Sequence, residues 1–64
     1  MKNKIKETRE ELGMSQEELS KKSGVSRTTI SELETGKTDV ITNVTLEKIS
    51  NALNRKVTEI FFQD

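Results

Sequence analysis

The segment Met14–Leu19 constrains the fold of this chain more than any other stretch. Ser15 and Glu18 have the S-x-x-E spacing of a capping box, in which each side chain accepts a hydrogen bond from the backbone N–H of the other residue. Met14 and Leu19 stand at the two positions of a hydrophobic staple, which fixes how the chain enters a helix. A helix therefore begins at Gln16, early in the chain.

The whole chain is predicted to consist of short helices separated by turn residues, without repeats or linkers. Strand patterns are absent, because β-branched residues nowhere alternate over a useful length. The expected fold class is all-α, with five helices in one compact domain over residues 1–64. The first predicted helix is about Asn3–Leu12, with Ile5, Arg9 and Leu12 inward and Gly13 at its end, and the second runs from Gln16 to about Ser23 and is ended by Gly24. The third follows the cap Ser26, has Ile30 and Leu33 inward and is ended by Gly36. The fourth follows Thr42 or Asn43, has Leu46, Ile49 and Leu53 inward and is ended by Asn54, and a short fifth helix has Val57, Ile60 and Phe61 on one face.

Composition excludes several classes of function. The 64 residues include no Cys and no His, so the chain has neither a thiolate nor an imidazole for metal binding, nucleophilic attack or proton transfer. We therefore expect no enzyme activity, no cofactor and no metal. The longest apolar run is Ile60–Phe62, far too short to cross a membrane, and this favours a cytoplasmic location.

A short turn containing Gly24 separates the second and third helices, which favours a helix-turn-helix. The segment Gln16–Gly36, QEELSKKSGVSRTTISELETG, resembles the DNA-binding unit of the lambda-repressor-like family, the Cro and phage-repressor type. The resemblance extends from about Ile5 to Phe61. It implies a prokaryotic or phage-type regulator whose recognition helix, about Arg27–Thr35, enters the major groove of double-stranded DNA. Such a regulator would be associated with the nucleoid.

The exposed face of the third helix agrees with this resemblance on chemical grounds. With Ile30, Leu33 and Glu34 inward, the side chains left over are polar, and such side chains can bond to base edges in a major groove. The resemblance assigns base reading to Arg27, Thr28 and Glu32, and phosphate contacts to Gln16, Thr29 and Lys37. The expected sites also include Ser31 among the residues that read bases, and Ser26 and Thr38 among those that hold phosphates.

Each of these assignments has a plainer interpretation. The third helix, taken alone, could be an ordinary solvated surface, and Lys37 an ordinary exposed lysine. Ser26 is explained equally well as a helix cap. Glu32 either accepts from a cytosine amino group or pairs with a Lys or Arg and rejects wrong sequences. The formal net charge of zero also lowers the expected affinity for DNA.

One further pair is predicted to be structural. Arg9 and Glu34 both lie on inward faces, and both positions are charged in the family, where they pair. A largely buried salt bridge between them would orient the first helix against the third, with a role in stability. The sequence also departs from the family at Thr8 and Ser20, where Leu and Ala are usual, and in the loop with Asp39, Val40 and Ile41, of which Val40 or Ile41 could pack under the fourth helix.

A single helix-turn-helix reads about half a site, so a two-fold homodimer on an inverted repeat is expected. Phe62, with Val57 and Arg55, is the candidate dimer surface, although Phe62 could simply close the core. No separate ligand-sensing domain is expected, and the most direct role is that of a repressor. Two alternatives stay open: a DNA-binding antitoxin with a protein partner, and a protein-interaction domain that keeps the fold without binding DNA.

Overall fold

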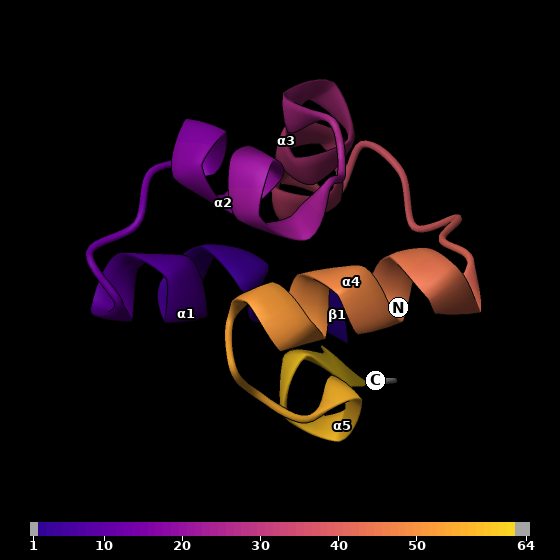
Figure 1. The fold of residues 1–64 in the computed structure, drawn as a ribbon. Coiled ribbons are helices and arrows are strands. Elements are labelled where there is room, and N and C mark those ends of the chain that lie inside the picture. The colour runs from indigo at the N-terminus through magenta and orange to yellow at the C-terminus, as the bar shows by residue number, and fades with distance from the viewer. Residues whose placement is uncertain (1, 63–64) are drawn as a thin grey trace.

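A computed structural model gives the fold and describes residues 2–62. Five helices follow one another along the chain, and a short pair of strands joins its two ends (Figure 1). The elements are β1 (Lys2–Asn3), α1 (Ile5–Glu11), α2 (Gln16–Ser23), α3 (Arg27–Thr35), α4 (Asn43–Ala52), α5 (Val57–Ile60) and β2 (Phe61–Phe62).

Local capping groups fix where the helices begin, as the sequence predicts. The hydroxyl of Ser15 accepts from the Glu18 N–H at 3.0 Å, and the Glu18 carboxylate accepts from the Ser15 N–H at 3.0 Å, which completes the capping box of α2. Ser26 caps α3 and Thr42 caps α4 in the same manner, through the N–H three residues on. Gly24 ends α2 in the left-handed conformation, with φ of 76°, which costs a residue without a Cβ little.

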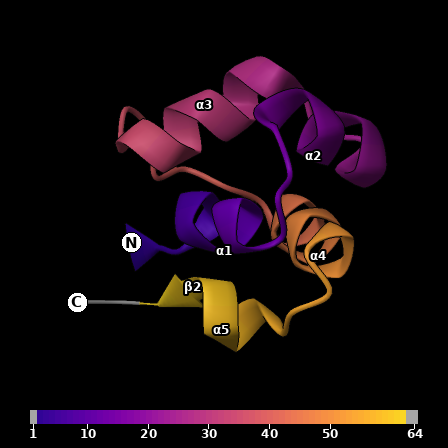
Figure 2. The ribbon, with the colours of Figure 1, turned by 90° about the vertical axis from the view of Figure 1, so that its left-hand side faces the viewer.

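The helices lie in layers around one core. Figures 1 and 2 show α2 and α3 on one side of the molecule, α1 and α4 beneath them, and α5 with β2 on the far side. Every helix contributes at least one buried apolar side chain to the space between these layers. The core consists of Ile5, Leu19, Val25, Ile30, Leu33, Ile49, Ala52, Leu53, Ile60 and Phe61.

The first helix differs from its prediction. It begins at Ile5 and not at Asn3, and it ends at Glu11, so that Leu12 is its C-cap. Leu12 consequently turns away from the core and is 43% exposed, whereas Thr8, one turn after Ile5, is buried. The prediction that Leu12 faces inward was wrong because it continued the helical period through a residue at which the helix unwinds.

The strands β1 and β2 correct the expectation that the chain holds no strand. They form an antiparallel ribbon in which Lys2 is opposite Phe62 and Asn3 is opposite Phe61. Phe61 thus contributes to the core from a strand and not from the fifth helix. Two residues per strand are too few to produce an alternating pattern in the sequence, and the fold remains all-α in its architecture.

The loop between α3 and α4 contains Val40 and Ile41, of which the sequence predicted one to pack inward. Ile41 is partly buried and packs against the core, while Val40 is 86% exposed. Of the two residues that the sequence offered for packing, Ile41 therefore packs against the core and Val40 lies in solvent.

Candidate nucleic-acid interface

Helix α3 has one buried and one exposed face. Ile30 and Leu33 anchor it to the core, while Arg27 and Thr28 at its beginning are exposed. The helix lies at the outer edge of the molecule, beside α2 (Figure 2). The polar face of α3 is therefore open to contact with a ligand.

The turn between α2 and α3 is fixed by two serine side chains. The Ser20 hydroxyl donates to the carbonyl oxygen of Val25 at 2.7 Å, and the Ser23 hydroxyl accepts from the Val25 N–H at 3.1 Å. Both polar groups of the Val25 backbone are thus bonded to α2, and the Val25 side chain is buried. Ser20, which departs from the usual alanine, therefore helps to set the crossing of the two helices.

An open hollow lies on the exposed face of α3. It brings together all four predicted base-reading residues and two of the predicted phosphate contacts, Gln16 from α2 and Lys37 from the following loop. Thr35 also lines it, and its hydroxyl donates to the backbone oxygen of Ser31 at 2.9 Å. The residues that line the hollow are Gln16, Arg27, Thr28, Ser31, Glu32, Thr35 and Lys37.

The beginning of α3 is electropositive. Arg27 is exposed and makes no hydrogen bond or ion pair with any other residue in 2–62. The first turn of α3 contains no acidic residue, so nothing there offsets the positive end of the helix dipole. By contrast, the first turn of α2 holds Glu17 and Glu18. A negatively charged ligand on this face is therefore attracted most strongly to the first turn of α3.

Glu32 and Lys37 form an ion pair across the end of the hollow. The Lys37 Nζ lies 3.8 Å from the Glu32 Oε2, and both side chains are open to solvent. Exposed pairs of this kind contribute only about 0–1 kcal/mol to stability. Glu32 thus has the lysine partner that the sequence left as one of two possibilities.

Three of the predicted phosphate contacts do not line the hollow. Ser26 caps α3 and also donates to the Thr29 hydroxyl at 2.8 Å. Thr38 donates its N–H to the Glu32 carbonyl oxygen at 3.3 Å, and its hydroxyl accepts from the Val40 N–H. These side chains are engaged within the protein, at the two ends of α3.

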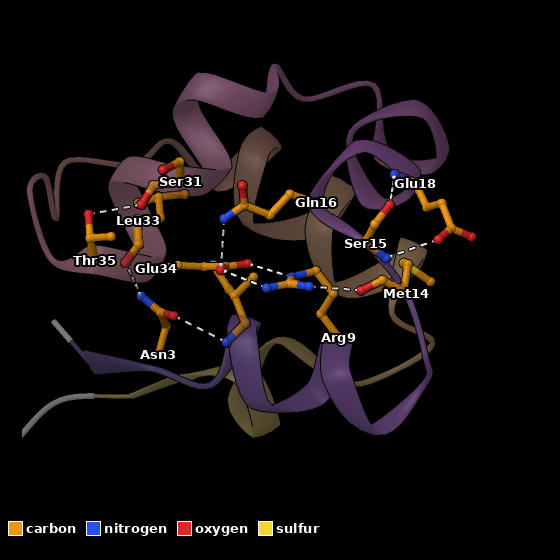
Figure 3. Close-up of polar contacts among 11 residues, drawn as sticks. Asn3, Arg9, Met14, Ser15, Gln16, Glu18, Ser31, Leu33, Glu34 and Thr35 are labelled. Carbon is orange, nitrogen blue, oxygen red and sulfur yellow. Dashed lines mark hydrogen bonds and ion pairs between the residues drawn. The ribbon is translucent and has the colours of Figure 1, made fainter.

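A buried polar cluster lies behind the hollow (Figure 3). Glu34 accepts from Arg9 through two bonds, Nε to Oε2 at 2.9 Å and Nη2 to Oε1 at 3.1 Å. The predicted salt bridge is therefore present, and its side chains are only 11% (Arg9) and 2% (Glu34) exposed. The hydrogen bond to Glu34 raises the pKa of Arg9 above its ordinary value, so the guanidinium remains charged.

Sequence reasoning missed the third member of this cluster. The Gln16 Nε2 donates to Oε1 of Glu34 at 3.1 Å, although the two residues are 18 positions apart. Gln16 at the start of a helix gives no signal of such a partner, because the contact depends on how α2 packs beside α3. Arg9 further donates from Nη1 to the Met14 carbonyl oxygen at 2.8 Å.

The residues predicted for a dimer surface fall into two places. Phe62 is 36% exposed and lines a hollow with Lys4, Thr58 and Glu59, and the Lys4 Nζ lies 5.9 Å from the centre of its ring. Val57 and Arg55 line a different hollow, beside the end of α4. Val57 also packs against the core.

Two other kinds of site are absent from residues 2–62. These residues hold no group of three or more carboxylate, imidazole or thiol side chains that could bind a metal ion. None of their helices is long and apolar enough to cross a membrane.

Comparison with known proteins gives a consistent result. A family described as "Helix-turn-helix" matches residues 5–60. Two proteins of the archaeon Archaeoglobus fulgidus, each named as an uncharacterised HTH-type transcriptional regulator, are 41% and 42% identical over 64 residues, which is all of this chain and 90% and 89% of theirs. The uncharacterised HTH-type transcriptional regulator YgzD of Bacillus subtilis is 40% identical over 63 residues, 97% of this chain and 92% of its own.

Proposed function

Because the chain belongs to the lambda-repressor-like helix-turn-helix family of DNA-binding transcriptional regulators, we propose that it binds a short inverted-repeat operator in double-stranded DNA as a homodimer and represses transcription there. Residues 1–64 act as one domain without catalytic activity, in the cytoplasm where the DNA lies. Repression requires only that the operator be occupied, whereas activation requires a further contact with the transcription machinery.

One observation carries this proposal: the polar hollow over α3 gathers residues that can read base edges. Arg27 can donate two hydrogen bonds to guanine, and Thr28 and Ser31 can bond to a base edge or contact a thymine methyl group. Glu32 can accept from the amino group of cytosine. These four side chains are the proposed base-reading set.

The proposed phosphate contacts surround this set. Lys37 and Gln16 reach the backbone from the rim of the hollow, and Lys37 exchanges the Glu32 carboxylate for a phosphate when it does so. Ser26, Thr29 and Thr38 contribute from the ends of α3, where backbone N–H groups can also reach phosphate. With one arginine and one lysine at the hollow, we expect a modest electrostatic contribution and a strong dependence on base contacts.

A dimer would place two α3 helices one turn of DNA apart, about 34 Å. Phe62 is the proposed centre of its interface, because an exposed phenylalanine gains most from being covered by a second copy. Val57 and Arg55 lie in the neighbouring hollow and form the rim of the proposed dimer interface. Phe62→Asp is expected to yield a monomer in sedimentation equilibrium without unfolding the domain.

The function is tested by selecting binding sites from a random duplex library and titrating the winner at two salt concentrations. An enriched inverted repeat with half-site centres about ten base pairs apart supports a dimeric, sequence-specific regulator. Failure to enrich any sequence, with no binding at low salt, would contradict the proposal and favour a protein-interaction domain. An enriched site that requires a copurifying protein would favour the antitoxin alternative.

A further inference from the structure

Glu34 is the one carboxylate buried within the part of the chain described here, residues 2–62, and it joins three helices. Its side chain is 2% exposed. It belongs to α3, and its three hydrogen bonds come from Arg9 of α1 and Gln16 of α2 (Figure 3). A salt bridge with Arg9 alone would neutralise the charge, so the additional bond from Gln16 needs its own explanation.

The chemistry of Glu34 fixes the orientation of the Gln16 side-chain amide. Glu34 accepts two hydrogen bonds from the Arg9 guanidinium, and a carboxylate paired in this way can only accept hydrogen bonds. Gln16 must therefore turn its Nε2 toward Glu34, and Figure 3 shows its oxygen directed away. Without the carboxylate, the amide could rotate by half a turn and present either atom to its surroundings.

Gln16 connects this buried cluster with the hollow over α3. It is the first residue of α2, it is half-buried, and it lines the hollow beside Arg27, Ser31 and Lys37. The Nε2 has two hydrogens, of which Glu34 takes one. The other has no partner within residues 2–62, so a donor of fixed direction remains for a ligand on this face.

We propose that Glu34 is a positioning residue for DNA binding, which holds Gln16 so that its second Nε2 hydrogen meets one backbone phosphate. This inference rests on the proposed function and deepens it. Phosphate oxygens only accept hydrogen bonds, so the fixed amide offers the atom that they require. The rotamer freedom that a glutamine would lose on binding has already been lost in folding.

The competing explanation is that Gln16 merely satisfies a lone pair of a buried carboxylate. Both explanations predict that Glu34 stabilises the fold, so stability cannot separate them. They differ in one respect: only positioning makes the contribution of Gln16 to DNA binding depend on Glu34.

The test replaces single phosphates of the selected operator by neutral methylphosphonates and measures the affinity of four proteins. For the wild type we expect one phosphate per half-site whose replacement weakens binding about five- to tenfold through this contact. Gln16→Ala should lose this sensitivity. So should the double variant Arg9→Met/Glu34→Met, which removes the buried pair without leaving an unpaired charge.

The matched control is Ile49→Val, a core change in α4 that lowers stability without touching the cluster, and it should keep the sensitivity. A double variant that retains wild-type sensitivity would overturn the inference alone. A wild type that binds no duplex would overturn the proposed function and this inference with it.

If the double variant does not fold, hydrogen exchange of the two Nε2 hydrogens of Gln16 in the wild type decides. Slow exchange of the hydrogen bonded to Glu34 in the unbound protein, joined by slow exchange of the second hydrogen when the operator is added, supports the inference. A second hydrogen that still exchanges at the rate of a free glutamine peptide in the complex contradicts it.

Discussion

Asn3 of β1 donates from Nδ2 to the carbonyl oxygen of Leu33 at 3.0 Å, so the first strand is bonded to the last turn of α3 (Figure 3). The same side chain accepts from the Ile5 N–H at 3.1 Å through Oδ1. One asparagine thus bonds to the N–H at the beginning of α1, which a helix leaves without an internal partner, and to a carbonyl at the end of α3 that, within residues 2–62, otherwise accepts only from the Gly36 N–H at 3.4 Å. The end of α3 nearest Lys37 is held in this way.

We expect Asn3→Ala to destabilise the domain by about 1–2 kcal/mol, because both helix ends lose a hydrogen bond. Urea unfolding measures this change, and amide exchange near Thr35 should become faster. Asn51→Ala is the control, since Asn51 is exposed on α4 and its side chain makes no bond within residues 2–62. Equal stability of the two variants would show that the Asn3 side chain contributes nothing.

Replacing Ser50 by alanine is expected to stabilise the protein, whereas replacing a buried serine whose hydroxyl is hydrogen-bonded destabilises it. It is 1% exposed, and its hydroxyl has no hydrogen-bond partner within residues 2–62. Ser50→Ala removes this unsatisfied group and improves helix propensity, so we expect a gain of about 1 kcal/mol in unfolding free energy. Ser23→Ala is the matched comparison: its hydroxyl accepts from Val25, and its loss should destabilise by about 1 kcal/mol. A loss in both variants would refute the prediction for Ser50.

The capping box of α2 predicts a dependence of stability on pH. The Ser15 backbone N–H bonds to the Glu18 carboxylate and lowers the pKa of Glu18 below its ordinary value. A lowered pKa in the folded state stabilises the protein above the ordinary glutamate pKa of about 4.5, and this contribution is lost as the pH falls through the lowered value.

Glu18→Gln keeps the capping geometry without the charge, so it should be less stable than the wild type near pH 7 and equal to it at strongly acidic pH. Chemical unfolding across this range measures the difference. Glu47→Gln, on the exposed surface of α4, serves as control. If the difference in unfolding free energy between Glu18→Gln and the wild type did not change with pH, the lowered pKa of Glu18 would not be its cause.

The Arg9–Glu34 pair should show strong coupling in unfolding experiments. Arg9→Met alone leaves a buried carboxylate without its cation, and we expect a loss of about 3–5 kcal/mol. Removing both charges in Arg9→Met/Glu34→Met should recover most of that loss, because apolar side chains of similar volume replace a pair that was costly to desolvate. Additive losses in the double variant would mean that the two residues act independently.

Arg27 and Lys37 should differ in how their loss affects DNA binding. Arg27→Ala is expected to cost about 1–3 kcal/mol on the selected operator and to relax preference at one base pair per half-site. Lys37→Ala should weaken binding to all sequences alike. It should also reduce the slope of log affinity against log salt concentration by about one. Anisotropy titrations on the operator and on single-base variants distinguish the two patterns. A uniform loss for Arg27→Ala would reassign it to a phosphate.

Features determined within a few residues could be predicted from the sequence. The capping box at Ser15, the caps at Ser26 and Thr42, and the left-handed Gly24 and Gly36 depend only on local backbone chemistry. They define both ends of α2 and α3 and the beginning of α4 closely. The Arg9–Glu34 pair was also predictable, because both charges were assigned to inward faces and because the family resemblance implies that these two positions pair.

The other features that depend on packing between distant residues could not be predicted. The ribbon pairs Lys2 with Phe62, and no local pattern marks two-residue strands. The Gln16–Glu34 bond requires α2 and α3 to be in place, and the outward turn of Leu12 depends on where α1 stops. In the proposed interface, the residue types were thus predictable, but the hydrogen bond that fixes Gln16 to Glu34 was not.

The β1–β2 ribbon also orders the events of folding. Its partners Lys2 and Phe62 are 62 − 2 = 60 positions apart, so pairing them closes almost the whole chain into a loop. Such a closure has a large entropic cost unless the intervening helices have already brought the ends together. We therefore expect the ribbon to form last and to open first. Phe62 would then take its final position only in a folded monomer, and the proposed pairing of two copies would follow folding.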